Sequence, residues 1–335
     1  MQIVRSLADL PSELRGGAVT IGNFDGVHRG HAQLIERLVA QAKRVGGPAV
    51  VFTFDPHPLA LLKPEIVPTP MTRVARKAEL LGELGATALI AYPTDWALLK
   101  LDPQQFFDLV IGKQLAAQAI VEGPNFQFGR ERTGNIGVLR ELCQQAAIEL
   151  EVLVPICFGE VDHHAERAEY SGEATIISSS RVRNLIQAGQ VGRANEMLTQ
   201  PYRIRGIVAR GAARGRTISF PTANLEQIET VLPAPGVYAA RCWVDGQAYK
   251  AAVNVGANPT FGDSATKIEV HLIDFQGDLY DQTLSVDFLD RLRDIQQFSS
   301  VDDLVAQLHR DVAAARRQSN RCAVSANQES KLPNS

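Results

Sequence analysis

The feature that most constrains the fold of this chain is an alternation, through residues 1–184, of short apolar runs with stretches of helical spacing. The apolar runs are AVTIG, AVVFTF, ATALIAY, AIVEG and LEVLVP. Between them, helical patterns begin near His31, Thr72, Pro103 and Ile136. A short run that is apolar at almost every position is typical of a strand buried on both faces. Joined by helices, such strands predict an α/β fold with a parallel sheet covered on both sides.

The pattern changes at Tyr202. Five strand-like runs follow, separated by Gly, Pro, Asn and Asp: YRIRGIV, GVYAARCWV, QAYKAAV, TKIEVHLI and TLSVDFL. Asp245-Gly246 between two of these runs indicates a two-residue hairpin turn. Many strands with few helices favour a compact β-barrel or a β-sandwich. One helix, capped by Ser300, is expected to follow the last strand.

Two domains are expected, because 335 residues exceed the size at which a single core usually stops growing. We assign residues 1–184 to the α/β domain and residues 185–200 to a helical linker. Residues 201–317 form the β domain with its helix. The tail, 318–335, has few apolar side chains and is expected to be disordered.

Composition excludes several classes of protein. The net charge is −3 and no basic run occurs, so we expect no nucleic-acid partner. The four cysteines show neither C-x-x-C nor zinc-site spacing, which argues against a disulfide framework or a zinc centre. No apolar stretch has the length of a membrane span or of a signal peptide core. We therefore expect a cytoplasmic protein with no membrane partner.

The segment IGNFDGVHRGH, residues 21–31, leads from the first strand into the first helix. Its glycines, including Gly22 and Gly30, let the backbone approach a ligand closely. The helix that follows offers free N–H groups and the positive end of its dipole to an anion. His28 and His31, one helical turn apart, can donate hydrogen bonds to phosphate oxygens on which charge develops. The alternative is that both histidines are ordinary polar residues at a helix start.

A second candidate site lies in RGIVARGAARGRTISFPTANL, residues 205–225. Gly211, Gly215 and Arg216 belong to a glycine-spaced basic loop that can fold over a polyphosphate. Thr222 and Asn224 are two residues apart in an extended segment, so their side chains point to the same side. Hydroxyl and carboxamide oxygens suit a Mg²⁺ ion that also binds water and phosphate.

A phosphoryl transfer to a hydroxyl also gains from a carboxylate that orients the hydroxyl and takes its proton. Glu269 is the candidate, on a strand-like run in which it shares a face with His271 and Ile273. Without further information, the alternative is a solvated charge on an exposed strand face.

The first half resembles a known family. GNFDGVHRGH, with FTFDPHP and GPNFQFG, is similar to the FMN adenylyltransferase half of bacterial bifunctional riboflavin kinase/FAD synthetases, within the H-x-G-H nucleotidyltransferase superfamily. The resemblance implies a Rossmann-like domain, and IISSSRVR matches the superfamily's second ATP-binding element. The implied ATP-binding residues are Gly22, Asn23, Phe24, His28, His31, Ser178, Ser179, Ser180 and Arg183. The implied FMN-binding residues are Asp55, His57 and Asn125, the last standing where many members have aspartate.

The second half resembles the riboflavin kinase domain, through GRTISFPTANL, GVYAARCWV, AVNVGANPTFG and EVHLIDFQGDLYDQTLSVDFLDRLR. The resemblance implies a six-stranded antiparallel β-barrel with a C-terminal helix, Glu269 as the catalytic base, and Thr222 and Asn224 as magnesium ligands. The implied kinase ATP-binding residues are Gly211, Gly215, Arg216, Thr222 and Asn224. The implied flavin-binding residues are Asn254, Arg291, Arg293 and Asp294.

Together the two resemblances imply FAD biosynthesis from riboflavin, with riboflavin, FMN and ATP as substrates and Mg²⁺ as cofactor. The barrel would make FMN, and the α/β domain would adenylylate it with release of pyrophosphate. Two alternatives remain at this level. The barrel could be a non-catalytic module that senses flavin, or the H-x-G-H kinship with aminoacyl-tRNA synthetases could indicate RNA binding. The sequence predicts no oligomeric state.

Overall fold

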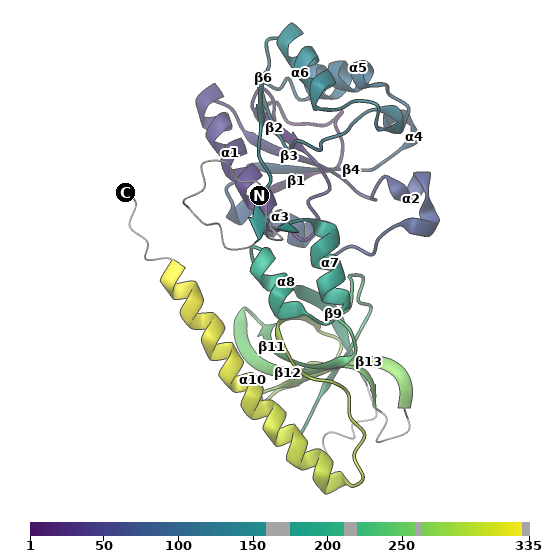
Figure 1. Cartoon of the computed structure of the whole chain (residues 1–335), viewed down its shortest axis with the longest axis vertical. Helices are drawn as coiled ribbons and strands as arrows, with labels where there is room; N and C mark the ends of the chain where they lie inside the picture. The colour runs from purple at the N-terminus through teal and green to yellow at the C-terminus, as the bar shows by residue number, and fades with distance from the viewer. Residues whose placement is uncertain (159–174, 211–219, 259–262, 330–335) are drawn as a thin grey trace. The chain divides into compact units, whose positions relative to one another are not determined.

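The computed structural model describes residues 1–158, 175–210, 220–258 and 263–329, and the chain divides into two compact units (Figure 1). The first unit comprises Met1–Pro68 and Thr72–Ser179, and the second comprises Thr69–Met71 and Ser180–Ser335. The region expected to be a helical linker contains α7 (Ser179–Gln187) and α8 (Val191–Met197). From Ser180 onward both helices belong to the second unit.

The first unit contains a six-stranded sheet. Its strands are β1 (Gln2–Val4), β2 (Ala18–Ile21), β3 (Ala49–Phe54), β4 (Ala88–Tyr92), β5 (Ala119–Glu122) and β6 (Glu149–Val152). They pair in the order β1-β4-β3-β2-β5-β6, and every pairing is parallel. The parallel α/β sheet predicted from the alternating pattern is confirmed. A separate short pair, β7 (Cys157–Phe158) and β8 (Thr175–Ile176), is antiparallel.

Helices and helical turns connect the strands of the first unit. They are η1 (Ser12–Leu14), α1 (Arg29–Val45), α2 (Leu59–Leu62), η2 (Pro64–Ile66), α3 (Val74–Glu83), α4 (Trp96–Leu99), α5 (Pro103–Phe106), the π-helical η3 (Phe107–Gln114), η4 (Arg130–Arg132) and α6 (Ile136–Gln145). The helices expected near His31, Thr72, Pro103 and Ile136 are all present, with starts shifted by no more than two residues.

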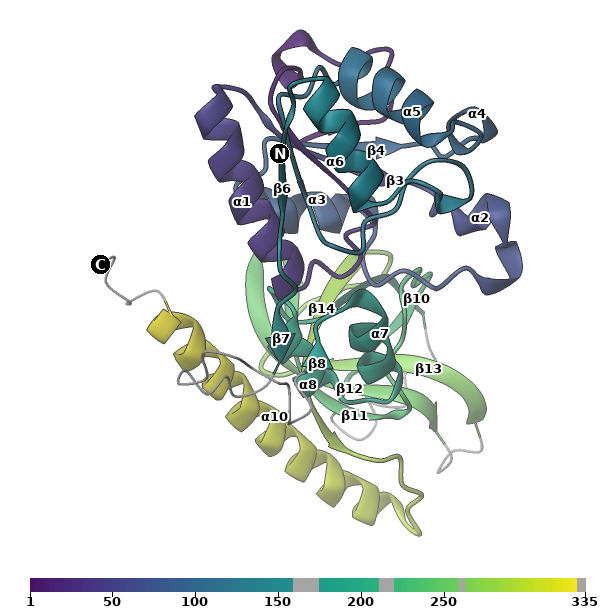
Figure 2. The same ribbon diagram turned by 45° about the horizontal axis from the view of Figure 1, so that its top comes forward.

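Both faces of the sheet are covered, because successive strand residues point to opposite sides. In β3, Val51 packs into the core that contains Ile35 and Leu38 of α1. Its neighbour Phe52 packs into the other core, which contains residues of η3 and α6. Figure 2 shows α1 and α6 with strands of the sheet between them. Two apolar layers therefore hold the sheet in the middle of the unit.

The strand order fixes where a ligand can bind in this unit. The chain adds β3 and β4 on one side of β2 and then returns to add β5 and β6 on the other side. In open α/β sheets, ligands bind outside the carboxyl ends of the strands at such a reversal. The expected position is therefore the turns that follow β2 and β5.

The second unit is a closed antiparallel barrel with the order β10-β13-β12-β11-β14-β9. Its strands are β9 (Arg203–Ala209), β10 (Ala223–Glu226), β11 (Gly236–Val244), β12 (Gln247–Asn258), β13 (Asp263–Leu272) and β14 (Thr283–Arg293). Closure decides between the barrel and the sandwich that the pattern left open. The expected hairpin joins β11 to β12, with φ values of 48° at Asp245 and 79° at Gly246, as a type I′ turn requires.

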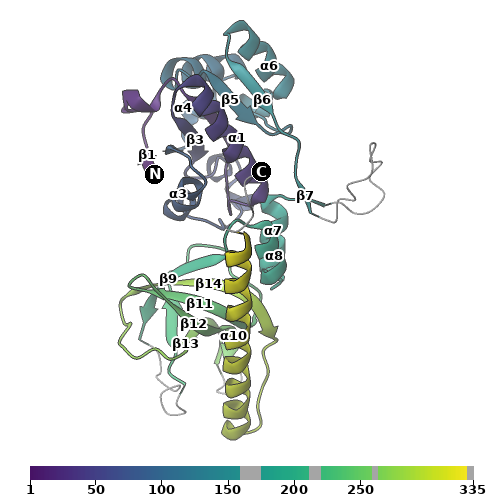
Figure 3. The ribbon, with the colours of Figure 1, turned by 90° about the vertical axis from the view of Figure 1, so that its left-hand side faces the viewer.

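The helix α10 (Val301–Glu329) lies along the outside of the barrel strands (Figure 3). Ala315 of α10 is buried against Ala239 and Ile273. The expectation of a disordered tail from residue 318 differs from the structure, since α10 continues to Glu329. The physical reason is that no glycine or proline interrupts the helical sequence before Pro333. No helix in the described part of the chain is both long and apolar enough to cross a membrane.

Candidate functional sites

The turn after β2 carries the histidine pair predicted from sequence. His28 is the N-cap of α1, where its Nδ1 accepts a hydrogen bond from the His31 backbone N–H at 3.2 Å. In return, the His28 backbone N–H donates to Nδ1 of His31 at 3.3 Å. The two rings stack, with centroids 3.6 Å apart and an interplanar angle of 14°. The pair therefore forms a reciprocal capping box, in which each ring satisfies a backbone donor that the helix leaves open.

This arrangement fixes the protonation of both rings. A ring nitrogen that accepts a hydrogen bond carries no proton, so the proton of each neutral imidazole sits on Nε2. Burial lowers the pKa of His28 from the ordinary 6.5 to about 4. Burial, together with the nearby charges of His28 and Lys77, lowers the pKa of His31 well below its ordinary value. At neutral pH the site therefore presents two uncharged Nε2–H donors.

Gly30 lies between the histidines, where a side chain would press on the His28 ring. A Cβ atom there would be 3.2 Å from both Cε1 and Nδ1 of the His28 ring. That is tighter than ordinary van der Waals contact, so the ring would have to shift by a few tenths of an ångström. Glycine at this position thus leaves the stacked ring undisturbed.

Residues from three further segments hold this turn in place through hydrogen bonds. Oε1 of Glu122, the last residue of β5, accepts from the Ile21 backbone N–H at 2.7 Å. The Asp25 carboxylate accepts from the backbone N–H and the hydroxyl of Thr72, at 3.0 and 3.1 Å. The Ser179 hydroxyl donates to the Asp25 carbonyl at 2.8 Å. The two ATP-binding segments predicted from sequence, which are about 150 residues apart along the chain, therefore meet at this turn.

The other predicted residues of the second ATP-binding segment lie along the chain next to Ser179. Ser178 precedes α7, and Ser180 lies in its first turn. Arg183, one turn further along α7, donates from Nε to the Thr69 carbonyl at 3.2 Å.

Of the remaining turn residues, Gly22 lies directly after β2, and a Cβ there would be 3.1 Å from the Phe24 ring. Phe24 is buried, and its ring centroid is 5.0 Å from that of His31. The Phe24 ring therefore packs against the His31 ring and does not face solvent.

The predicted FMN-binding residues lie at the same edge of the sheet. His57 follows β3, and its Nε2 is 2.9 Å from Nδ2 of Asn23 in the ATP-binding turn. Asp55 also follows β3 and pairs with Arg5 at 3.0 Å. Asn125 is exposed in the turn after β5. The carboxyl ends of β2, β3 and β5 thus carry the predicted residues for both substrates.

Sequence reasoning missed three residues of this site, the partly buried Thr72 and the buried Lys77 and Glu122. Lys77 is only 7% exposed and donates to the Asn23 carbonyl at 2.5 Å. Glu122 is 3% exposed, and burial raises its pKa well above the ordinary value although backbone donors oppose the shift. A charged residue within the apolar run AIVEG was the available signal for Glu122. A lysine in an amphipathic helix gives no such signal, because most are solvated.

In the barrel, the strand register brings together three of the predicted kinase residues. Asn224 of β10 is directly opposite Glu269 of β13, and Glu269 is directly opposite Asn254 of β12. Directly paired residues point to the same face, with Cβ atoms about 5 Å apart. All three are partly exposed, whereas the alternate positions Val253 and Val270 are buried. The prediction that Glu269 and His271 share a face is therefore confirmed, whereas Ile273, predicted on the same face, lies beyond β13 and is buried.

Thr222, two residues before Asn224, is exposed at the start of β10. The segment before it is tied to β13, because Nδ1 of His271 is 2.9 Å from the Pro221 carbonyl oxygen. The Phe220 ring contacts His271 and also His309 of α10, with centroid distances of 5.4 and 4.9 Å. Both the strand that bears Glu269 and the terminal helix thus fix the approach to Thr222.

The expected flavin-binding residues Arg291, Arg293 and Asp294 lie at the end of β14. Arg291 pairs with Asp294 at 2.8 Å and donates to the Pro235 carbonyl at 2.6 Å. Arg293 forms a bidentate pair with the buried Asp311 of α10, with Nη2 to Oδ2 at 2.7 Å. Its guanidinium therefore fastens the helix to the barrel. The remaining predicted loop residues, Gly211, Gly215 and Arg216, lie outside the described residues.

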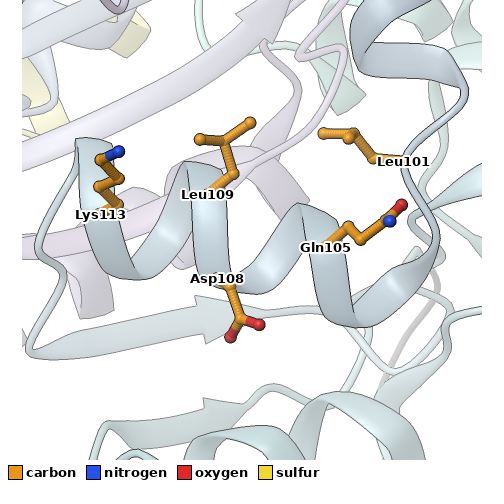
Figure 4. Close-up of a pocket in the computed structure, with 5 residues that line it drawn as sticks. All are labelled: Leu101, Gln105, Asp108, Leu109 and Lys113. Carbon is orange, nitrogen blue, oxygen red and sulfur yellow. The ribbon is translucent and has the colours of Figure 1, made fainter.

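A shallow depression lies elsewhere, over α5 and η3. Its lining is Leu101, Gln105, Asp108, Leu109 and Lys113 (Figure 4). None of these residues belongs to either predicted site, and the depression is wide open to solvent. We assign it no ligand.

Comparisons with known proteins cover both units. Residues 10–165 match the FAD synthetase family model, and residues 198–319 match the riboflavin kinase family model. The chain is 36% identical to the bifunctional riboflavin kinase/FMN adenylyltransferase of Pseudomonas fluorescens, over 94% of this chain and 97% of that protein. It is 32% identical to the protein of the same name from Escherichia coli strain K12, with the same coverage. A crystal structure called macrolide-efflux protein, from Streptococcus pneumoniae, superposes with a TM-score of 0.79 at 32% identity, covering 94% of this chain and 98% of that one.

Proposed function

The chain belongs to the family of bifunctional riboflavin kinase/FMN adenylyltransferases, and from that membership we propose that it makes FAD from riboflavin in two ATP-dependent steps. The barrel phosphorylates riboflavin to FMN. The parallel-sheet unit transfers the adenylyl group of ATP to FMN and releases pyrophosphate. Neither step requires a covalent enzyme intermediate, so positioning and charge stabilisation supply the catalysis.

For adenylyl transfer, we assign to His28 and His31 the stabilisation of charge on the α-phosphate and the leaving pyrophosphate. Their Nδ1 atoms are occupied by the capping box, which leaves both Nε2–H groups as donors in fixed positions. Fixed donors in a dry site are effective because they need no reorganisation during the reaction. The backbone N–H groups at the start of α1 add to this anion site. The FMN phosphate attacks from the side of β3, where Asp55 and His57 lie.

For phosphoryl transfer, Glu269 orients the riboflavin hydroxyl and accepts its proton. The observation that carries this assignment is the register of Asn224, Glu269 and Asn254 on three adjacent strands. It puts the candidate base directly beside a candidate metal ligand, as a reaction between a hydroxyl and a metal-bound phosphate requires. A barrel that only senses flavin would not need this combination, and Thr222, Asn224 and Glu269 are all present.

The oxygens of Thr222 and Asn224 fit a magnesium ion that enters with the nucleotide. Both are neutral donors, and Mg²⁺ commonly keeps several waters and phosphate oxygens among its ligands. Within the described residues there is no group of three or more His, Cys, Asp and Glu residues that would hold a metal ion without the nucleotide. When bound, the ion neutralises charge on the transferred phosphoryl group.

The test is a time course with riboflavin, ATP and Mg²⁺, resolving riboflavin, FMN and FAD by chromatography. We expect FMN to appear first and then to convert to FAD. Asn224→Ala should abolish FMN formation while FMN supplied from outside still becomes FAD. His28→Ala/His31→Ala should stop at FMN. Full-rate riboflavin phosphorylation by Asn224→Ala would refute the kinase assignment, and unchanged FAD synthesis by the double variant would refute the other.

A further inference from the structure

A buried lysine, Lys77, contacts the turn after β2, and the proposed mechanism gives it no role. Lys77 is on α3 and is 7% exposed. Its ammonium donates to the Asn23 carbonyl at 2.5 Å and is 3.4 Å from the Thr53 hydroxyl. The Thr53 hydroxyl itself donates to the same carbonyl at 3.2 Å. Lys77 therefore joins Asn23, in the turn after β2, to Thr53 near the end of β3.

These contacts converge on Asn23, which borders both substrates under the proposed function. Its backbone belongs to the turn that leads to His28 and His31. Its side-chain amide is 2.9 Å from Nε2 of His57, in the segment assigned to FMN. A displacement of Asn23 would therefore move the groups on the two sides of the reaction relative to each other. In adenylyl transfer that separation governs whether the FMN phosphate is in line for attack.

The chemical nature of the residue is also informative. The hydrogen-bond partners of the ammonium are two neutral oxygens, and burial lowers the pKa of Lys77 while Asp25 and Asp55 oppose the shift. Burying a cationic group without a directly bonded carboxylate is costly for folding. A neutral residue would fill the same space at lower cost. Because ATP and FMN are both anionic, a positive charge near their site can offset part of their negative charge.

We propose that Lys77 is a positioning residue for adenylyl transfer, which holds the Asn23 carbonyl where the turn after β2 meets the segment after β3 and so sets the alignment of ATP with FMN. The proposal rests on the proposed function of this unit. It assigns Lys77 no contact with the reacting atoms.

The experiment compares Lys77→Met, which keeps length but loses the donors, with Lys77→Arg, which keeps donors and charge. Lys113→Met, at an exposed lysine of the same unit, is the matched control. For each full-length protein, kcat and KM for ATP and FMN are measured with FMN supplied. Riboflavin phosphorylation by the barrel serves as an internal measure of intact protein in the same sample.

We expect Lys77→Met to lower the kcat of FAD synthesis by about 10- to 100-fold, the effect of a misalignment near 1 Å. Its KM values should change by less than about threefold, and riboflavin phosphorylation should match the wild type. Lys77→Arg should recover part of the lost kcat, and Lys113→Met should behave as wild type. A purely structural role would instead reduce the amount of folded unit without changing kcat per folded molecule.

Two results would overturn the proposal: a wild-type kcat in Lys77→Met, or a loss that follows the loss of folded protein measured by Trp96 fluorescence. If Lys77→Met does not fold, Thr53→Val decides, because it keeps the lysine but removes both the Thr53 donor to the Asn23 carbonyl and the hydroxyl that contacts the Lys77 ammonium. We then expect a kcat reduced several-fold at unchanged stability, and an unchanged kcat rejects the proposal. If the wild-type protein itself makes no FAD from FMN, the proposed function is wrong. That outcome differs from a failure of the Lys77 proposal, in which the wild-type protein is active.

Discussion

At the scale of single residues, the histidine pair shows how one interaction serves both folding and chemistry. The Nδ1 atoms of His28 and His31 cap α1, and the same hydrogen bonds direct the Nε2–H groups away from the helix. A protonated ring cannot accept at Nδ1, so the cap exists only when the rings are neutral. Stability of the first unit and protonation of its two histidines are therefore linked.

This linkage predicts a pH dependence with a definite sign. The pKa of His28 is about 4 in the folded protein against 6.5 ordinarily, so below pH 6.5 the unfolded chain binds a proton that the folded chain does not. The stabilisation is complete above pH 6.5 and is lost as the pH falls towards 4, up to about 3 kcal/mol.

The measurement is urea denaturation at pH 8 to 4.5, followed by Trp96 fluorescence in a Trp243→Phe background, since the chain has two tryptophans and one lies in each unit. His28→Asn keeps an N-cap side chain but cannot titrate, so it should make the profile less steep, with the remaining slope coming from His31. A His28→Asn profile as steep as that of the wild type would contradict the linkage.

Gly30 gives a prediction in which stability and activity separate. Gly30→Ala improves helix propensity by up to about 1 kcal/mol, so the unit should not be destabilised by the backbone. The new Cβ would nevertheless press on the His28 ring at 3.2 Å. We expect FAD synthesis to fall by about tenfold or more, with riboflavin phosphorylation unchanged in the same assay.

The matched control for that variant is Gly112→Ala in η3, where a Cβ would meet only the Phe107 carbonyl at an ordinary 3.6 Å. It should leave both activities as they are. Equal losses in the two variants would show that the His28 ring is not the cause.

At the scale of elements, a buried carboxylate joins three strands of the barrel. Asp287 of β14 is 1% exposed. It pairs with Arg203 of β9 at 2.5 Å and with Arg241 of β11 at 3.1 Å, and it accepts from Nε1 of Trp243 at 2.8 Å. These partners are distant in sequence and meet only because β9, β14 and β11 are neighbours in the closed barrel.

Removing the carboxylate should destabilise the barrel strongly. Asp287→Asn leaves two guanidinium groups without their counter-ion, and breaking a buried pair in this way costs about 3–5 kcal/mol. Trp243 in a Trp96→Phe background reports the loss as a shift in the urea midpoint. Asp302→Asn, at an exposed carboxylate of the same unit, should change the free energy of unfolding by less than about 0.5 kcal/mol. If Asp287→Asn also changed the free energy of unfolding by less than about 0.5 kcal/mol, the ion-pair cluster around Asp287 would make no net contribution to stability.

At the scale of the whole molecule, each compact unit has its own buried core, and the histidine pair lies in the first unit while Thr222, Asn224 and Glu269 lie in the second. FMN made by the barrel then needs only to diffuse to an adenylyltransferase site. We expect a mixture of Asn224→Ala and His28→Ala/His31→Ala proteins to convert riboflavin to FAD, although neither does so alone. A mixture that accumulates FMN without FAD would show that the product of one site must pass within one molecule.

Most elements of the fold could be predicted from local patterns, and the exceptions have physical reasons. The strand β1 was missed because its three residues are too few to show the two-residue alternation of a strand. The strand pattern could not choose between barrel and sandwich because strand alternation is the same in both, and it was the family resemblance that predicted the six-stranded barrel confirmed here. Among the site residues, the H-x-G-H pair and the Thr222–Asn224–Glu269 set were predicted from motifs, whereas Lys77 and Glu122 were not.

By itself, the sequence determined the two-part organisation, the parallel sheet, the β11–β12 turn and the residue types of both sites. Periodicity, turn chemistry and short motifs are local, and each is complete within about 20 residues. The tertiary structure alone decided that β2 and β5 meet at the strand reversal, that Asn224, Glu269 and Asn254 share one row, and that Lys77 lies beneath Asn23. Strand register and helix packing bring these groups together across long stretches of chain, and no local pattern encodes which distant side chains will become neighbours.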